Sequence, residues 1–161
     1  MTANIPFLSS TMEIVPAWID YNNHLNMAYY HVLLDRGADQ AFALMGIDET
    51  YTATRGFTSY AAEYRLQYRR ELHLGDTVRV GFQLLEVDDK RFHFCQWLLH
   101  QDGWVAAQGE GVGLHIDPNG PRVVPFPADI AAKVAALQAK HASHPIPDFV
   151  GRRIGLTGND K

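Results

Sequence analysis

One short segment holds most of the polar side chains that could do chemistry. It reads Asp20-Tyr21-Asn22-Asn23-His24-Leu25-Asn26. A carboxylate (Asp20), an imidazole (His24) and the N–H groups of a following helix are the components of an acyl-transfer centre, because such N–H groups can stabilise a developing oxyanion. The alternative is a capping turn, in which Asn26 caps the helix and the other groups bond local backbone. One cap needs only one polar side chain, so the segment is richer than capping requires.

Other catalytic patterns are absent from the sequence, which has no G-x-S-x-G, H-E-x-x-H, Walker or G-x-G-x-x-G motif. Cys95 is the single cysteine and lies in an apolar, strand-like stretch, so we expect a buried structural thiol rather than a nucleophile. Gly109, Gly111 and Gly113 alternate along another such stretch. Alternation puts all three on one face of a strand, which predicts close packing rather than a phosphate loop.

The composition fits one compact soluble domain of 161 residues, 47% of them hydrophobic, with a net charge of −4. The single cysteine and the lack of an apolar run near the ~18 residues of a membrane span predict a cytoplasmic protein with no nucleic-acid or membrane partner. We expect no metal, because His141 and His144 lack a further ligand at the usual spacing. Every Lys and Arg except Arg36 lies at or beyond Arg55, so an anionic substrate would contact the later part of the chain.

The elements that must position the polar segment follow from periodicity and turn signals. A strand is predicted over 10–15, a largely buried helix over 27–45 and then a loop through Thr54. Long extended segments are predicted over 57–68, 77–87, 91–101 and 105–116, and a second helix over 128–142. The tight turns between the extended segments predict antiparallel pairing.

These elements predict a single α+β domain over residues 1–161, with a core of about 10–117, a C-terminal helix and an irregular tail over 145–161. Its architecture is a five-stranded antiparallel sheet wrapped around a long central helix. Such a sheet covers only one face of the helix and leaves open edges. We therefore expect a homodimer or a dimer of dimers.

Two motifs carry a resemblance to a known family. The first is Asn23-His24-Leu25-Asn26-Met27-Ala28-Tyr29-Tyr30, preceded by Asp20 and followed by Asp35. It resembles the G-H-V-N-N-x-x-Y…E pattern of hotdog-fold acyl-CoA thioesterases of the 4-hydroxybenzoyl-CoA thioesterase type. The second is Tyr68-Arg69-Arg70-Glu71-Leu72-His73-Leu74-Gly75-Asp76, which is similar to that family's entry into its third strand. Later segments, among them Asp89-Lys90-Arg91-Phe92-His93 and Gly151-Arg152-Arg153-Ile154-Gly155, look most like the betainyl-CoA thioesterases of carnitine breakdown.

The resemblance implies a hotdog fold and hydrolysis of a small acyl-CoA, such as betainyl-CoA, to free acid and CoA without a cofactor. Asp20 aligns with the family's catalytic carboxylate, which acts as a nucleophile or as a base on water. The backbone N–H of Met27 or Ala28 would polarise the thioester carbonyl, a contribution of about 3 kcal/mol. His24 either orients Asp20 or water or is structural. The family's glycine before the histidine is Asn23 here, and its second asparagine is Met27.

Further residues are candidates for binding the two ends of the substrate. The acyl candidates are Trp18, Tyr21, Tyr30 and, across the dimer, Glu63. For a trimethylammonium acyl group, an aromatic cage could draw on Trp18, Tyr21, Tyr29, Tyr30, Tyr60 and Tyr64. The candidates for the CoA phosphates are Lys90, Arg91, Arg152 and Arg153. The alternative for each is an ordinary core or surface position.

Two other functions compete with thioester hydrolysis. An (R)-specific enoyl-CoA hydratase of the same fold carries a D-x-N-P-x-H motif, which Asp20-Tyr21-Asn22 begins. Here the proline is missing and His24 follows Asp20 by four residues instead of five. The second competitor is a non-catalytic acyl-CoA-binding module, which predicts no turnover and intact ligand binding after a change at Asp20.

Overall fold

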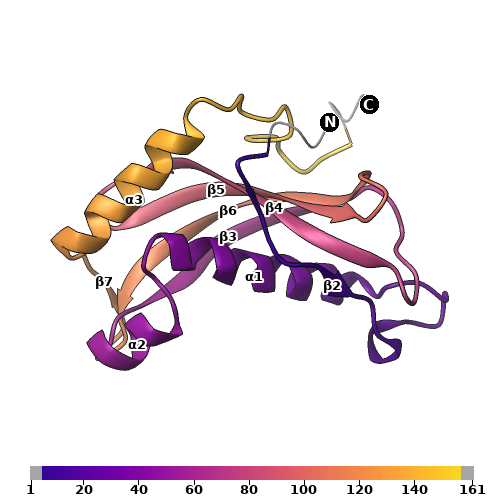
Figure 1. Ribbon diagram of the computed structural model, residues 1–161, viewed down its shortest axis with the longest axis horizontal. Coiled ribbons are helices and arrows are strands. Elements are labelled where there is room, and N and C mark those ends of the chain that lie inside the picture. The colour runs from indigo at the N-terminus through magenta and orange to yellow at the C-terminus, as the bar shows by residue number, and fades with distance from the viewer. Residues whose placement is uncertain (1–4, 157–161) are drawn as a thin grey trace.

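A computed structural model describes residues 5–156 and has an antiparallel sheet that curves around a long helix (Figure 1). The helices are α1 (Met27–Leu44), α2 (Glu49–Arg55) and α3 (Ala128–His141), with a 3-10 turn, η2, at Pro16–Trp18. The long strands are β3 (Thr58–Tyr68), β4 (Thr77–Val87), β5 (Arg91–His100) and β6 (Val105–Asp117). The short strands are β1 (Phe7–Leu8), β2 (Met12–Glu13) and β7 (Arg122–Val123). The α+β expectation is confirmed. Across residues 5–156, no helix is long and apolar enough to cross a membrane.

The main path of the sheet runs β1-β4-β5-β6-β3, with β2 beside β4 and β7 beside β6. The strands β4, β5 and β6 are antiparallel neighbours joined by tight turns, as the sequence predicts. The strand β3 pairs with β6 rather than with the next strand along the chain, β4. The connection over 69–76 therefore crosses the sheet. Within the described chain, β3 forms an edge whose second side has no paired strand.

The helix α1 forms close to its predicted bounds. Asn26 caps it by accepting a hydrogen bond from the Ala28 N–H at 3.0 Å, and Gly46 follows its last turn with a φ of 75°. Gly37 lets the helix contact β4 directly, because a Cβ at this position would lie 2.2 Å from the Cβ of Val80. The helix is therefore held against the sheet along its middle.

Two hydrophobic clusters lie at the two ends of α1. The cluster at its N-terminal end is mainly aliphatic, and its buried members include Ile14, Leu25, Leu33, Leu34, Leu72, Val78, Val80 and Leu98. The cluster at its C-terminal end is rich in aromatic rings, and its buried members include Met45, Tyr51, Phe82, Phe92, Phe94, Phe126, Ile130 and Val134. The α3 residues of this cluster close the core beside the free part of the β4 edge.

The strand predicted over 10–15 is wrong in its bounds, because the edge segment is broken into β1 and β2. The two pieces pair with β4 in registers that differ by one residue, with Ser9 between them. The Ser9 hydroxyl accepts the Val80 N–H at 2.8 Å and so replaces a regular ladder bond. The break is a local bulge that sequence alternation did not reveal.

The loop predicted through Thr54 is also wrong, because residues 49–55 form α2. Its signals were present in the sequence: Asp48 caps the helix through the Tyr51 N–H at 2.7 Å, and Gly56 ends it at a φ of 73°. Tyr51 anchors α2 to the sheet, since its hydroxyl lies 2.8 Å from Nε2 of the fully buried His115.

The C-terminal tail has no regular structure, as predicted, but its described part crosses the face of the sheet opposite α1 (Figure 1). Phe149 packs edge-on against Trp97 of β5, and its carbonyl accepts a hydrogen bond from Arg65 of β3. The Gly151 N–H donates to Glu110 of β6 at 2.8 Å. Residues 157–161 of the predicted tail lie outside the described residues.

Candidate active site

The polar segment before α1 forms a small closed loop. Ile19 and Leu25 pair as an antiparallel bridge, and between them the Asp20 N–H donates to the His24 carbonyl at 3.0 Å. The Leu25 N–H also donates to the Leu72 carbonyl at 2.7 Å, which ties the loop to the connection before β4. The backbone therefore holds Asp20 directly beside the start of α1.

Asn23 explains how the loop closes without the family's glycine. Its φ is 63°, which makes it the one non-glycine residue with a positive φ among residues 5–156. Asparagine adopts the left-handed region at lower cost than most side chains, because its short amide can bond locally. The substitution therefore preserves the turn that a glycine would form.

The site's two chemical groups are a carboxylate and a backbone N–H. Oδ1 of the half-buried Asp20 accepts the Asn22 N–H at 2.8 Å, which fixes the direction of the carboxylate. Of the two helix donors expected from the sequence, the Ala28 N–H is taken by the Asn26 cap. Met27 is the first residue of α1, so its N–H has no carbonyl partner within the helix, and it has no hydrogen bond to the described residues. It is the donor left to polarise a carbonyl oxygen.

The other candidates near this loop, His24 and Trp18, do not converge on Asp20 within one subunit. Nδ1 of His24 lies 3.4 Å from the Leu25 carbonyl, and no hydrogen bond joins its ring to Asp20 within the described chain. Trp18 stacks on Tyr29 at 5.5 Å between ring centroids, and the guanidinium of Arg36 lies 5.2 Å from the Trp18 ring. The Trp18 ring therefore already contacts a cation of its own chain.

Tyr30 is buried and supports the loop rather than opening onto it. Its hydroxyl accepts the Leu72 N–H at 3.1 Å and donates to the Arg70 carbonyl at 3.3 Å. Burial raises the pKa of this phenol, so it stays protonated and able to donate. These two bonds fix the connection before β4 against α1.

The six aromatic residues expected to form a cage are not assembled in one subunit. Trp18 pairs with Tyr29, Tyr30 packs edge-on against Tyr68, and Tyr64 packs against His31. Tyr21 is 93% exposed at the tip of the loop. Tyr60 lies on the β3 edge instead. One subunit alone therefore does not assemble all six rings around a common space, and the cage stays a prediction.

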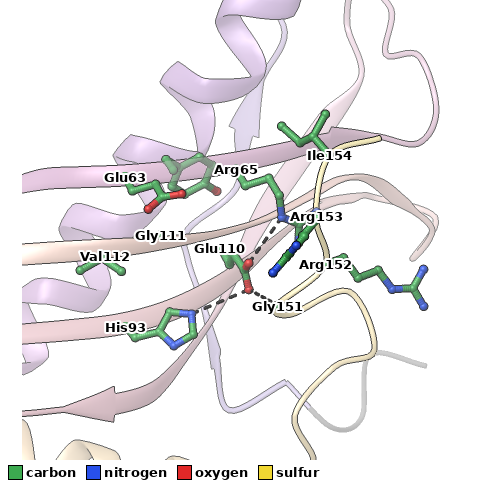
Figure 2. Close-up of a pocket in the computed structure, with 11 residues that line it drawn as sticks. Glu63, Arg65, His93, Glu110, Gly111, Val112, Gly151, Arg152, Arg153 and Ile154 are labelled. Carbon is green, nitrogen blue, oxygen red and sulfur yellow. Dashed lines mark hydrogen bonds and ion pairs between the residues drawn. The ribbon is translucent and has the colours of Figure 1, made fainter. Parts of the chain in front are cut away.

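Glu63, Arg152 and Arg153 come together in a cavity of about 490 Å³ on the face of the sheet opposite α1 (Figure 2). The mostly buried Glu110 lies in this cavity, 3.4 Å from Nε of Arg65 and 3.8 Å from Nε2 of His93. Figure 2 shows Arg152 extending away from Glu110. The two tail arginines thus form a basic rim, with the sheet between them and Asp20.

Lys90 and Arg91 lie in the turn between β4 and β5. Arg91 pairs with Asp88 at 2.6 Å, and the Lys90 carbonyl accepts the His115 N–H at the end of the sheet near α2. The 18 residues of α1 span about 27 Å between this end and the Asp20 loop. Within one subunit these cations are therefore far from the candidate catalytic group.

The structural thiol and the glycine stripe are as predicted. Cys95 is fully buried, and burial together with the nearby Glu110 raises its pKa to about 12. A Cβ at Gly113 would lie 2.2 Å from the Phe92 ring, and one at Gly111 would lie 2.6 Å from the Tyr64 ring. Aromatic rings therefore lie directly on the β6 backbone.

Sequence reasoning missed a groove of about 120 Å³ between α1 and β3. Its helical wall carries His31, Asp35 and Asp39, and its strand wall carries Tyr60 and Tyr64. The four-residue spacing of the helical residues is visible in the sequence, but the spacing alone does not indicate a groove. The position of β3 beside this stripe depends on the crossed strand order, which the sequence did not reveal.

This architecture and site define a class of protein. Residues 14–134 match the family model of the thioesterase-like superfamily, so the chain belongs to that superfamily. Among curated relatives, it is 36% identical to the betainyl-CoA thioesterase of Pseudomonas aeruginosa over 89% of this chain and 91% of the relative. It is also 31% identical to the L-carnitine dehydrogenase/betainyl-CoA thioesterase of Rhizobium meliloti, over 96% of this chain but only 31% of that longer protein.

Solved structures agree on the fold. A Staphylococcus aureus protein determined in complex with CoA superposes with a TM-score of 0.85 at 24% identity, covering 93% of this chain and 94% of that one. A DHNA-CoA thioesterase from the same organism gives 0.77 at 14% identity, covering 87% and 97%. The protein therefore has the hotdog fold. Its family match and its curated relatives identify it as an acyl-CoA thioester hydrolase.

Proposed function

We propose that the protein hydrolyses betainyl-CoA to betaine and CoA, with Asp20 as the catalytic carboxylate and the Met27 N–H as the oxyanion donor. The observation that supports this site is the pairing of a half-buried, directed carboxylate with a helix N–H that lacks a partner in the described chain. The names of the curated relatives support the substrate. No cofactor takes part in the proposed reaction.

The proposed reaction needs few groups. In one route, the Asp20 carboxylate attacks the thioester carbon, the C–S bond breaks, and water then hydrolyses the mixed anhydride. In the other route, Asp20 removes a proton from a water molecule that attacks the same carbon. In both routes the Met27 N–H stabilises the oxyanion, and the CoA thiol, with a pKa near the ~8.5 of cysteine, leaves as a thiolate without strong acid catalysis.

We further propose that the active unit is a homodimer formed through β3. The free edge of β3 offers unpaired backbone groups, and its exposed stretch includes Tyr60, Ala61 and Glu63. A two-fold axis would pair two β3 strands antiparallel, so that each strand's beginning lies beside the other's end. This arrangement would bring the partner's Lys90 and Arg91 toward the Asp20 loop, where they are candidates for the CoA phosphates. Arg152 and Arg153 remain candidates on the opposite face.

A thiol-trapping assay tests the proposed function directly. Betainyl-, aromatic, short-chain and long-chain acyl-CoAs are compared, and betainyl-CoA is expected to release thiol with the highest kcat/KM. Absence of thiol release from all four contradicts hydrolysis and favours a binding module. Hydration of a short enoyl-CoA without thiol release would instead favour the hydratase.

The proposed setting is carnitine breakdown in the cytoplasm. The fusion of an L-carnitine dehydrogenase with a betainyl-CoA thioesterase in the Rhizobium meliloti relative supports the metabolic link. The buried Cys95 suits a reducing compartment. A strain that lacks the gene and grows normally on carnitine would contradict this setting while leaving the enzymatic proposal intact.

A further inference from the structure

The groove between α1 and β3 has aromatic walls. Its cavity of about 120 Å³ is lined by Phe42, Tyr60, Tyr64, Phe92 and Phe94, with Gly113 as part of the floor. The Tyr64 hydroxyl is held by Gln96 at 3.1 Å, so that ring has a fixed orientation. Aromatic faces carry negative charge density and attract cations, quaternary ammonium groups in particular.

The helical wall adds two carboxylates without a counter-ion. Asp35 and Asp39 are one turn apart, and within residues 5–156 no Lys or Arg lies within ion-pair distance of either. Burial and the charge of Asp35 raise the pKa of Asp39. His31, one turn before Asp35, is the other titratable group that lines the groove from α1. An external cation bound here would relieve the repulsion between the two aspartates.

The groove and the catalytic loop of one subunit are too far apart to hold the same acyl group. Asp39 follows Met27 by twelve residues, a rise of about 18 Å along α1. In betainyl-CoA the quaternary nitrogen is two bonds from the thioester carbonyl carbon. A substrate whose thioester carbonyl is bound by the Met27 N–H therefore cannot place its quaternary nitrogen beside Asp39 of the same chain.

A reversed β3 pairing removes this mismatch. The Tyr68 hydroxyl, at the end of β3, donates to the Met27 carbonyl at 3.4 Å, whereas Tyr60, near the start of β3, lines the groove. Antiparallel pairing of two β3 edges puts the start of one strand beside the end of the other. The groove of one subunit then faces the Met27 loop of its partner.

We infer that the groove binds the trimethylammonium head of an acyl group whose thioester carbonyl is held by the N–H of the partner's Met27. Asp39 is the groove residue that selects for the positive charge of this head. Tyr60 and Tyr64 contact the methyl groups, and Asp35 adds a second negative charge. The inference rests on the proposed function and adds to it the residues that recognise the substrate's charge.

A neutral isostere isolates the effect of charge. In tert-butylacetyl-CoA a carbon replaces the quaternary nitrogen, so the two substrates have the same shape. The ratio of kcat/KM for betainyl-CoA to that for the isostere is measured in wild type, Asp39→Asn, Asp39→Glu and the control Glu49→Gln, which changes an exposed acid outside the groove. We expect Asp39→Asn to lower this ratio about tenfold. Asp39→Glu should retain most of it, and Glu49→Gln all of it.

The outcomes separate this inference from the proposed function. Thiol release from neither compound by the wild type contradicts the proposed function. Thiol release with no preference for the charged substrate, or a preference that Asp39→Asn leaves unchanged, overturns only the present inference. Circular dichroism of each variant checks that the fold is retained.

Mixed dimers test whether the two halves come from different chains. Asp20→Asn and Asp39→Asn subunits are unfolded together and refolded as a mixture. If the site is shared between chains, about a quarter of the sites pair an intact Asp20 with the partner's intact Asp39, and the preference for betainyl-CoA reappears. If both residues act within one chain, mixing restores no intact site, and that result overturns the inference.

Discussion

The two ends of α1 use their side chains in opposite ways. At the C-terminal end, aromatic rings fill the space between helix and sheet, and even the polar groups of Tyr51 and His115 bond to each other. At the N-terminal end, the apolar packing is aliphatic, and a loop with a left-handed residue keeps a carboxylate and a helix N–H accessible. One helix thus joins a packed region, whose rings also line the groove beside β3, to an accessible region that carries the candidate reactive groups.

The largest expected effect is at the accessible end. Asp20→Asn removes the charge but keeps an oxygen to accept the Asn22 N–H, so the loop should remain folded. We expect kcat for betainyl-CoA to fall about 10³-fold or more, with little change in the melting temperature. Thiol trapping and thermal unfolding measure the two quantities. Retained activity in a folded Asp20→Asn protein would remove the proposed mechanism.

At the packed end, Phe82→Ala should reverse this pattern. Phe82 is fully buried in the aromatic cluster, so its truncation should lower the free energy of unfolding by about 3–5 kcal/mol. The kcat of the molecules that stay folded should fall far less than in Asp20→Asn. Urea unfolding, with activity assayed below the transition, makes the comparison. A stability loss well under 1 kcal/mol would mean that this end is not the more tightly packed one.

The buried His141 makes the packed end sensitive to acid. Its Nδ1 accepts the Leu84 N–H at 2.9 Å, and burial, with His144 and Lys140 nearby, lowers its pKa from 6.5 to about 4. Between these values the unfolded chain binds a proton that the folded chain does not, so stability is complete above pH 6.5 and falls as the pH drops toward 4. We expect a loss of about 1–3 kcal/mol over this range.

His141→Gln is the matched variant for this effect, because its amide oxygen can accept the same N–H without titrating. Denaturant unfolding from pH 7 to 4.5 should show a shallower loss of stability in the variant than in the wild type. Parallel pH profiles would show that carboxylates elsewhere, and not His141, cause the acid sensitivity.

The smallest expected effect concerns the left-handed residue of the loop. Asn23→Gly should be nearly neutral, whereas Asn23→Ala should cost about 1 kcal/mol, because alanine cannot bond locally in the left-handed region. Comparing kcat in the two variants shows whether loop geometry supports the reaction. Equal stability and activity in both would mean that this turn is not strained.

Features set by local interactions were predicted from the sequence, whereas features set by long-range contacts were not. The cap at Asn26 and the tight turns between β4, β5 and β6 are local, and they were predicted nearly to the residue. The helix α2 was missed because its few residues show no clear apolar period, although Asp48 and Gly56 mark its two ends. The position of β3 beside β6, and with it the groove, depends on a long-range crossing that no local pattern encodes.

The same distinction applies to the candidate site. Asp20 and Met27 are seven residues apart, so their proximity follows from one turn and one helix start. The contact of Arg36 with the Trp18 ring, and the cavity that Arg152 and Glu63 share, depend on how distant segments pack. From the sequence, Trp18, Glu63 and Arg152 could be grouped only by chemical type.

The glycine stripe of β6 limits how this protein can diverge. Part of the groove's floor is backbone at Gly113, and any side chain there would meet the Phe92 ring at once. Mutation therefore cannot make the floor shallower by small steps, since the first added methyl group already forces the core to move. Relatives that accept other acyl groups would have to change the walls instead. In the proposed site, the exposed wall residues Asp35, Asp39 and Tyr60 could then vary over a floor that stays the same.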